Sequence, residues 1–87
     1  MSTYKPDFLL PNGVFIEVKG FFEPEDRTKH LLLRKQFPDL DVRFIFANSR
    51  MRLSTESKTS YGDWCMKHGF LYSDKRIPPA WFDEKEE

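Results

Sequence analysis

Apolar and polar residues alternate with a period of two near the start of the chain. Two short runs, residues 7–10 (DFLL) and 14–19 (VFIEVK), are separated by the tripeptide PNG at 11–13. Such alternation on both sides of a Pro-Asn-Gly turn is typical of a β-hairpin, because successive side chains of a strand point to opposite faces. We therefore expect the fold to begin with two antiparallel strands.

Two later segments carry the signals of helix ends. Residues 24–36 begin with a proline and two acids, and they end with Arg34 and Lys35 before another proline, which suits the polarity of a helix. The leucine run at 31–33 predicts wide burial of this helix. Residues 60–68 start with a Ser-x-x-Asp capping box, and the glycine that follows can end the helix.

The remaining segments complete a small sheet. Residues 41–47 (DVRFIFA) are apolar on both faces beyond their third position, which predicts a central strand. A polar loop at 48–58 follows, and 70–72 is expected to be a short strand. Two consecutive prolines then introduce a turn that should anchor Trp81 and Phe82. The order β-β-α-β-α-(β) predicts an α/β fold, a small mixed β-sheet flanked by helices.

Composition adds limits to this picture. At 87 residues the chain is short enough for one domain, which we place at 1–82. Residues 83–87 form an acidic tail, four acids and one lysine, that we expect to be disordered. The whole chain has a formal net charge of zero, so the tail at −3 leaves residues 1–82 at +3. This mild excess of positive charge is compatible with a nucleic-acid partner.

The cysteine content and the hydropathy of the chain indicate its cellular compartment. The single cysteine, Cys65, excludes an internal disulfide framework and suits a reducing setting. We expect Cys65 to pack in the core rather than to form a zinc site with His68, since two ligands do not make a site. The N-terminus has no apolar signal region, and no stretch approaches the roughly 20 apolar residues of a membrane span. We expect a soluble, cytoplasmic protein with no membrane partner.

The register of the hairpin decides whether its two carboxylates meet. A two-residue loop at 12–13 would pair Asp7 with Val18, whereas a three-residue loop at 11–13 would pair Asp7 with Glu17. Proline is preferred at the second position of a type I turn and glycine in the following bulge, so the longer loop is favoured. The longer loop also gathers five apolar side chains on one face: Phe8, Leu10, Val14, Ile16 and Val18.

On the other face, Asp7, Glu17 and Lys19 would cluster at the open end of the hairpin. Two adjacent carboxylates repel each other, and a divalent cation relieves that repulsion. Carboxylate, carbonyl and water oxygens are the ligands that Mg²⁺ accepts, and a lysine beside the ion can stabilise charge on a phosphate. The cluster therefore predicts phosphodiester hydrolysis. The alternative is structural, an aspartate at a strand start and a salt-bridged Glu–Lys pair on a solvated face.

Pro6-Asp7 and Glu17-Val18-Lys19 resemble the PD-(D/E)xK nuclease signature. Over residues 3–82 the chain resembles the phage endonuclease I family, Holliday-junction resolvases of podophage type. The resemblance lies in the strings YKPDFLLPNGVFIEVKG, DRTKHLLLRKQFPDLDVRF, TSYGDWCMKHG and DKRIPPAWF.

This resemblance implies a restriction-endonuclease-like core and cleavage of branched DNA with Mg²⁺ or Mn²⁺. It implies that Asp7 and Glu17 bind the metal together with the carbonyl of Val18, and that Lys19 is the catalytic lysine. It further implies a homodimer that acts in the cytoplasm of the phage-infected host cell.

The sequence departs from the family at its start. Family members carry an N-terminal helix with a further catalytic glutamate and a bridging strand that is swapped between subunits, whereas here no acid precedes Asp7. The expectation of a nuclease therefore stands beside two alternatives. The chain is a catalytically incomplete junction-binding module, or it is one piece of a split nuclease that needs the N-terminal segment from a partner chain. A purely structural partner domain is a third interpretation.

Basic residues supply candidate contacts to the DNA backbone. One group lies on the first helix and another in the polar loop, and either could equally be a solvated surface. The candidates are Lys5, Arg27, Lys29, Arg34, Arg50, Arg52 and Lys58.

Overall fold

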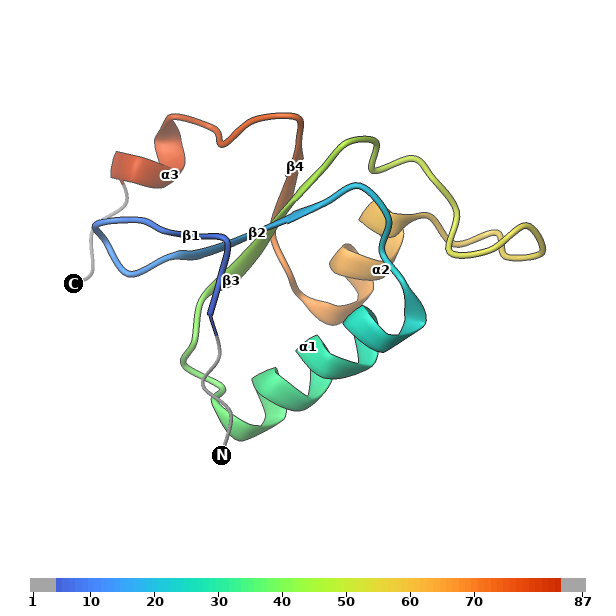
Figure 1. The fold of residues 1–87 in the computed structure, drawn as a ribbon, viewed down its shortest axis with the longest axis horizontal. Coiled ribbons are helices and arrows are strands. Elements are labelled where there is room, and N and C mark those ends of the chain that lie inside the picture. Colours follow the sequence, from blue (N-terminus) through green and yellow to red (C-terminus); the bar gives the residue numbers. More distant parts are fainter. Residues whose placement is uncertain (1–4, 84–87) are drawn as a thin grey trace.

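The computed structural model of the chain describes residues 5–83 (Figure 1). Its elements follow in the order β1 (Phe8–Leu9), β2 (Phe15–Lys19), α1 (Pro24–Gln36), β3 (Val42–Phe46), α2 (Tyr61–His68), β4 (Tyr72–Asp74) and α3 (Ala80–Asp83). The expected α/β fold, with a small mixed sheet and the element order β-β-α-β-α-β, is confirmed. Of the expected acidic tail, Asp83 ends α3, and 84–87 lie outside the described residues.

The four strands form one sheet in the order β1-β2-β3-β4. β1 runs antiparallel to β2, whereas β2, β3 and β4 run parallel to one another. Every residue of β3 is buried, as expected of the central strand. The α1 helix makes the crossover from β2 to β3, so its N-terminus lies near the carboxyl end of β2 (Figure 1).

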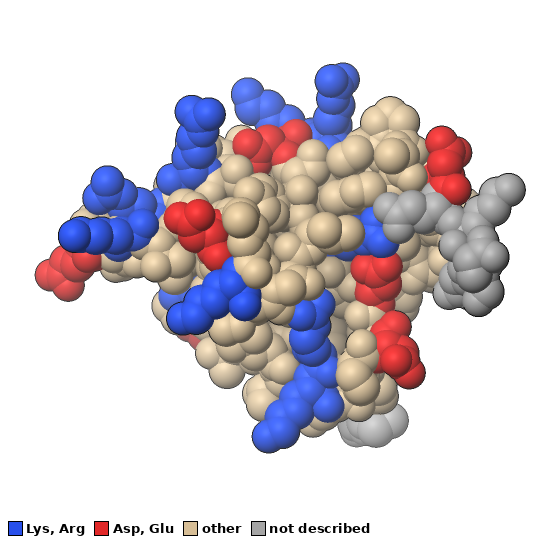
Figure 2. All heavy atoms as spheres, turned by 180° about the vertical axis from the view of Figure 1, so that it is seen from behind, with Lys and Arg blue, Asp and Glu red and all other residues tan. Residues whose placement is uncertain are grey.

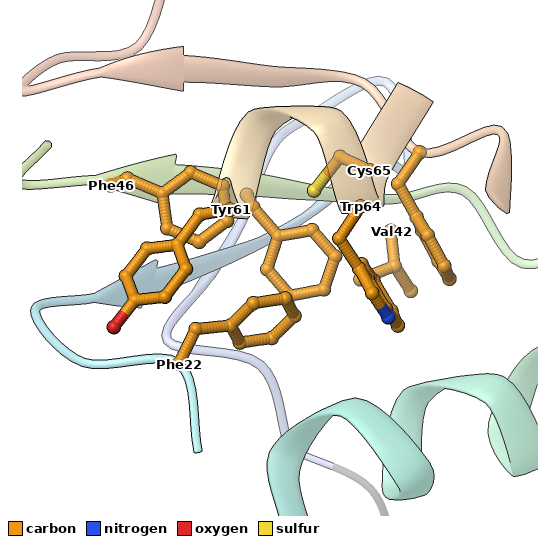
Figure 3. Packing of buried hydrophobic residues seen from close by; sticks show 8 residues of the cluster. Phe22, Val42, Phe46, Tyr61, Trp64 and Cys65 are labelled. Atoms are coloured by element: carbon orange, nitrogen blue, oxygen red, sulfur yellow. The ribbon is translucent and has the colours of Figure 1, made fainter. Parts of the chain in front are cut away.

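An aromatic core fills the face of the sheet that α2 covers (Figure 3). The buried ring of Phe22 lies at its centre, with its centroid 5.1 Å from that of Phe44 and 4.9 Å from that of Trp64. Large rings in tilted and edge-to-face contacts let a short chain bury much apolar area. Cys65 is fully buried in this core, as expected, and burial raises the pKa of its thiol to about 12.

The opposite face holds a smaller cluster in which Leu10, Ile16 and Ile45 pack against Trp81 of α3. Asn12 fastens α3 to the hairpin turn, because its Nδ2 donates to the Trp81 carbonyl oxygen at 2.7 Å. Arg43 stacks its guanidinium 5.1 Å from the centre of the Trp81 ring. The expected docking of Trp81 is thereby confirmed.

Several sequence-based expectations are wrong in detail. The turn was expected to anchor Phe82 as well as Trp81, but Phe82 is 49% exposed. Phe8 and Val18 are 55% and 47% exposed although they share the apolar face, because the four-residue α3 contacts only the turn end of the hairpin. The strand expected at 70–72 begins at Tyr72 instead.

The first helix is also less buried than its leucine run predicted. Leu32 is 54% exposed, and His30 is the only residue of α1 that is fully buried. The reason is geometric. Three consecutive helical residues spread over about 200° of the helix circumference, and only the narrow stripe with His30 and Leu33 faces the sheet.

Candidate active site

The hairpin register is the one that brings the two carboxylates together. Phe8 pairs with Ile16, and the N–H of Leu10 donates to the carbonyl of Val14 at 2.9 Å. The turn is therefore the three-residue loop that Pro-Asn-Gly favours, and Gly13 supplies its positive φ of 90°. Continued by one residue beyond β1, the same register places Asp7 opposite Glu17.

A side chain replaces the backbone at the end of the hairpin. The Asp7 carboxylate accepts a hydrogen bond from the N–H of Val18 through Oδ2 at 2.8 Å. In this register the residue opposite Val18 is Pro6, which has no N–H to donate. The carbonyl of Val18 therefore lacks the ladder hydrogen bond that a residue other than proline at position 6 would donate. This carbonyl lies next to the fixed carboxylate of Asp7.

Glu17 projects from β2 on the face of the aromatic core, where it is level with Phe44 of β3. It is only 5% exposed, so the interpretation of Glu17 as part of a solvated salt bridge is wrong. A buried carboxylate is costly unless positive charge or hydrogen bonds compensate it. The ion pair with Lys19 is long, 3.8 Å between Nζ and Oε1.

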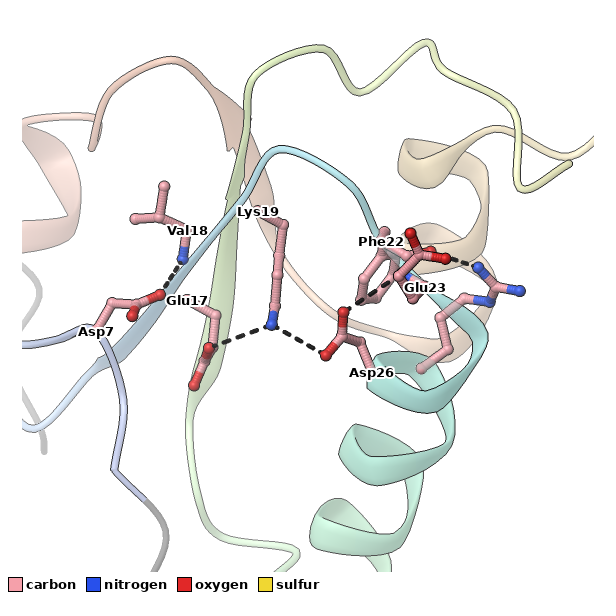
Figure 4. A network of polar contacts seen from close by, with 8 residues as sticks. Asp7, Glu17, Val18, Lys19, Phe22, Glu23 and Asp26 are labelled. Atoms are coloured by element: carbon pink, nitrogen blue, oxygen red, sulfur yellow. Dashed lines mark hydrogen bonds and ion pairs between the residues drawn. The ribbon is translucent and has the colours of Figure 1, made fainter.

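Lys19 lies between two carboxylates (Figure 4). Besides Glu17, its Nζ approaches Oδ1 of Asp26 at 3.3 Å, and Asp26 belongs to the first turn of α1. In the sequence, Asp26 is recognisable only as an acidic residue at the start of a helix. That position alone accounts for an aspartate, without any link to Lys19. Its contact depends on how α1 folds back after β2, and no local pattern encodes that distance.

Beneath these charges lies His30, the second residue that sequence reasoning missed. It is 1% exposed, and its ring packs edge-on against Phe44 with 4.9 Å between centroids. Burial, followed by the positive charges of Lys19 and Lys29, lowers its pKa from 6.5 to about 4, against the opposing effect of Asp26. Because the imidazole of His30 is neutral at pH 7, it adds no positive charge that would compete with Lys19 for the carboxylates of Glu17 and Asp26.

The oxygens gathered here suit a hard divalent cation. Asp7 and Glu17 supply carboxylates, and Val18 supplies a carbonyl at the hairpin end, which is the chemistry that Mg²⁺ and Mn²⁺ accept. Within residues 5–83 no three His, Cys, Asp or Glu side chains are grouped to hold a metal. A cation at this place would therefore depend on two side chains, one carbonyl and water, an arrangement typical of weakly held Mg²⁺.

Comparison with known proteins identifies the family of the chain. The family model of phage endonuclease I matches residues 1–87. The chain belongs to the phage endonuclease I family. It is 56% identical over 82 residues to the protein named Endonuclease I of Escherichia phage T7. This match covers 94% of this chain and 55% of that relative. It is 60% identical over 77 residues to Endodeoxyribonuclease 1 of Enterobacteria phage T3, with 88% and 51% covered. The chain thus spans about half the length of the curated relatives it matches.

Two of the candidate DNA-binding residues of this family member bind the protein's own backbone. Arg34 donates to the carbonyls of His68 and Gly69 at the end of α2, and its guanidinium lies 3.8 Å from the centre of the Phe70 ring. Arg27 donates to the carbonyl of Phe22 at 2.5 Å. Both arginines therefore connect elements of the fold, and any contact with DNA would come in addition.

The other candidates are exposed. Lys5, Lys29, Arg50, Arg52 and Lys58 all lie on the surface. Figure 2 shows basic side chains over the end of the molecule formed by the loop after β3 and along the edge formed by α1. Asp74 fixes the start of that loop, because its carboxylate accepts from the N–H and the hydroxyl of Ser49 at 3.0 and 3.1 Å. Contact of these five basic residues with DNA stays a prediction.

None of the helices within residues 5–83 is long and apolar enough to cross a bilayer.

Proposed function

We propose that this chain carries the metal-dependent catalytic core of an endodeoxyribonuclease that hydrolyses phosphodiesters of branched DNA such as Holliday junctions. The observation that supports it most is the hairpin register that sets Asp7 opposite Glu17, with Lys19 following on the same face. The names of the T7 and T3 relatives, Endonuclease I and Endodeoxyribonuclease 1, support DNA as the substrate.

Each residue of the site has a part in this hydrolysis. Asp7, Glu17 and the carbonyl of Val18 would hold Mg²⁺ or Mn²⁺, which when bound acidifies a water and neutralises phosphate charge. Lys19 donates hydrogen bonds to a non-bridging phosphate oxygen and so stabilises the negative charge that grows in the transition state. The burial of Glu17 excludes water behind the site and restricts its side chain. A water molecule attacks phosphorus in line and gives up a proton to solvent, while the opposite P–O bond breaks and the leaving sugar oxygen takes up a proton to become a hydroxyl.

Selectivity for branched DNA would come from shape and phosphate contacts rather than from reading bases. The exposed basic residues support this proposal, because they offer positive charge for contacts with phosphates. A homodimer would place two such sites on one junction.

A second candidate is junction binding without autonomous cleavage, either as a binding module or as one piece of a split nuclease. It is favoured by one observation, that the chain spans about half the length of its curated relatives. A partner chain would then supply what this chain does not, and the same assay distinguishes the two candidates.

The test is cleavage of a four-way junction against a linear duplex of the same sequence, over a range of Mg²⁺ concentrations. We expect junction cleavage that EDTA abolishes and that Lys19→Ala lowers by at least about a hundredfold. Lys67→Ala, which removes an exposed lysine from α2, is the matched control and should cleave like the wild type.

Cleavage that survives EDTA or Lys19→Ala would overturn the proposal. Salt-sensitive binding with no cleavage at any Mg²⁺ concentration would favour the binding module instead. Cleavage that appears only when an N-terminal segment is supplied as a separate chain would identify a split enzyme. A structural partner domain would show no salt-dependent affinity for DNA.

A further inference from the structure

The ammonium of Lys19 is held by carboxylates from two different elements of the fold. Its Nζ lies 3.8 Å from Oε1 of Glu17 on its own strand and 3.3 Å from Oδ1 of Asp26 on α1 (Figure 4). We infer that Asp26 is a positioning residue that aligns Lys19 for phosphodiester hydrolysis, an inference that rests on the function proposed above. The site would then consist of a hairpin and the start of a helix, rather than of a hairpin alone.

Asp26 is itself fixed in place. Its other oxygen, Oδ2, accepts a hydrogen bond from the N–H of Glu23 at 3.3 Å, which caps the N-terminus of α1. The segment between β2 and α1 is anchored by Phe22, whose ring is 1% exposed in the aromatic core and whose carbonyl binds Arg27 at 2.5 Å. A side chain that is hydrogen-bonded at one oxygen on a rigid element can hold a partner at the other with little motion.

The distances suggest why one carboxylate would not suffice. Glu17 makes the longer of the two ion pairs, and in the proposed mechanism it also binds the metal, whose charge weakens its attraction for an ammonium. Asp26 remains free for Lys19 throughout. A lysine side chain has several rotatable bonds and about 2 kcal/mol of rotamer entropy, so an unanchored ammonium would spend much time away from the phosphate. Asp26 counters this loss of alignment.

The chain contains its own control for helix capping. Asp63 occupies the same third helical position in α2, and its Oδ2 accepts from the N–H of Ser60 at the same 3.3 Å. Within the described part of the chain, Asp63 takes part in no ion pair with a lysine or arginine. Asp26→Asn and Asp63→Asn are therefore the same chemical change at the same capping position, with and without the lysine.

Two readouts test the inference. The first is the NMR signal of the Lys19 ammonium in metal-free protein, which reports how fast its protons exchange with water and needs no catalysis. The second is the division of the junction-cleavage rate between kcat and KM. Asp26→Asn keeps an acceptor for the N–H of Glu23 but removes the charge, and Asp26→Glu restores the charge.

We expect Asp26→Asn to speed exchange of the Lys19 ammonium several-fold and to lower kcat about tenfold to a hundredfold, with KM changed less than about twofold. Asp63→Asn should leave both readouts at wild-type values, and Asp26→Glu should recover part of kcat. Both Asn variants alter the same helix-cap contact and should lose a little thermal stability, and Asp26→Asn also loses the ion pair with Lys19, so its loss should be at least as large.

Unchanged exchange in Asp26→Asn, or an equal change in Asp63→Asn, would overturn the inference. A change confined to KM would also overturn it, because Asp26 would then act on DNA binding rather than on Lys19. If exchange responds to Asp26 alone but the wild-type protein cleaves no DNA, the ion-pair role is supported and the proposed function fails. The two claims are thus separated.

Discussion

The carboxylate of Asp7 accepts a hydrogen bond from the backbone N–H of Val18, 2.8 Å away, across the open end of the first hairpin. This bond takes the place of a backbone bond from the Val18 N–H to the carbonyl of position 6, and the proline there has no N–H to donate to the Val18 carbonyl. A strand end that would ordinarily fray is thereby fixed next to Glu17. The local sequence Pro-Asp thus has a structural purpose as well as a place in a motif.

The register of the hairpin should control metal affinity. Deleting Leu9 from β1 keeps the three-residue loop but moves Asp7 from opposite Glu17 to opposite Ile16, which turns its side chain to the other face of the sheet. We expect isothermal titration to show Mn²⁺ affinity lowered at least about tenfold. Asn12→Ala keeps the register but loses the hydrogen bonds that its side chain donates to the Trp81 carbonyl and accepts from the Val14 N–H, so it should bind Mn²⁺ like the wild type. Equal affinity in the deletion variant would contradict the register argument, provided that circular dichroism shows a folded chain.

Stability should depend on pH through His30. Its folded-state pKa of about 4 lies below the 6.5 of an unfolded chain, so the unfolded chain takes up a proton first as the pH falls. The stabilisation is complete above pH 6.5 and is lost toward pH 4. Between pH 7 and pH 5 we expect His30 to account for a loss of about 2 kcal/mol in the free energy of unfolding.

Urea unfolding at the two pH values measures this effect. In His30→Leu, the loss of unfolding free energy between pH 7 and pH 5 should be smaller by that amount, whatever the variant's stability at pH 7. The same pH dependence in both proteins would show that burial does not suppress protonation of His30.

A glycine in α2 should tolerate no side chain. A Cβ built on Gly62 would lie 2.8 Å from the hydroxyl oxygen of Tyr72 and 2.9 Å from its ring carbon Cζ. We expect Gly62→Ala to lower the free energy of unfolding by about 1–3 kcal/mol, because Tyr72 packs against the aromatic core and cannot move freely. Gly20→Ala is the control, since nothing lies within 4 Å of its Cβ position. A Gly62→Ala protein as stable as the control would show that Tyr72 can rotate away.

Local chemistry made some of these features predictable from the sequence. The Pro-Asn-Gly turn specified the register, and with it the pairing of Asp7 and Glu17, because turn geometry and apolar alternation agree. The Ser60–Asp63 capping box and the glycine after it placed α2 within one residue. In each case the decisive interaction spans only a few residues of the chain.

Tertiary distances were not predictable in the same way. The contact between Lys19 and Asp26 depends on the angle at which α1 leaves the sheet, and the depressed pKa of His30 depends on the rings that surround it. The exposure of Val18 likewise follows from the shortness of α3, since strand alternation assigns a face but does not say what covers it. Strand alternation and helix capping also do not specify which partners an exposed basic loop contacts.

In the proposed mechanism, the hairpin end binds a divalent cation through Asp7, Glu17 and the carbonyl of Val18. Anomalous diffraction from crystals soaked in Mn²⁺ locates such an ion directly. We expect a peak at about 2.0–2.4 Å from oxygens of all three residues, absent in Glu17→Gln crystals soaked in the same way. A peak elsewhere, or none at a Mn²⁺ concentration that supports junction cleavage, would contradict this metal site.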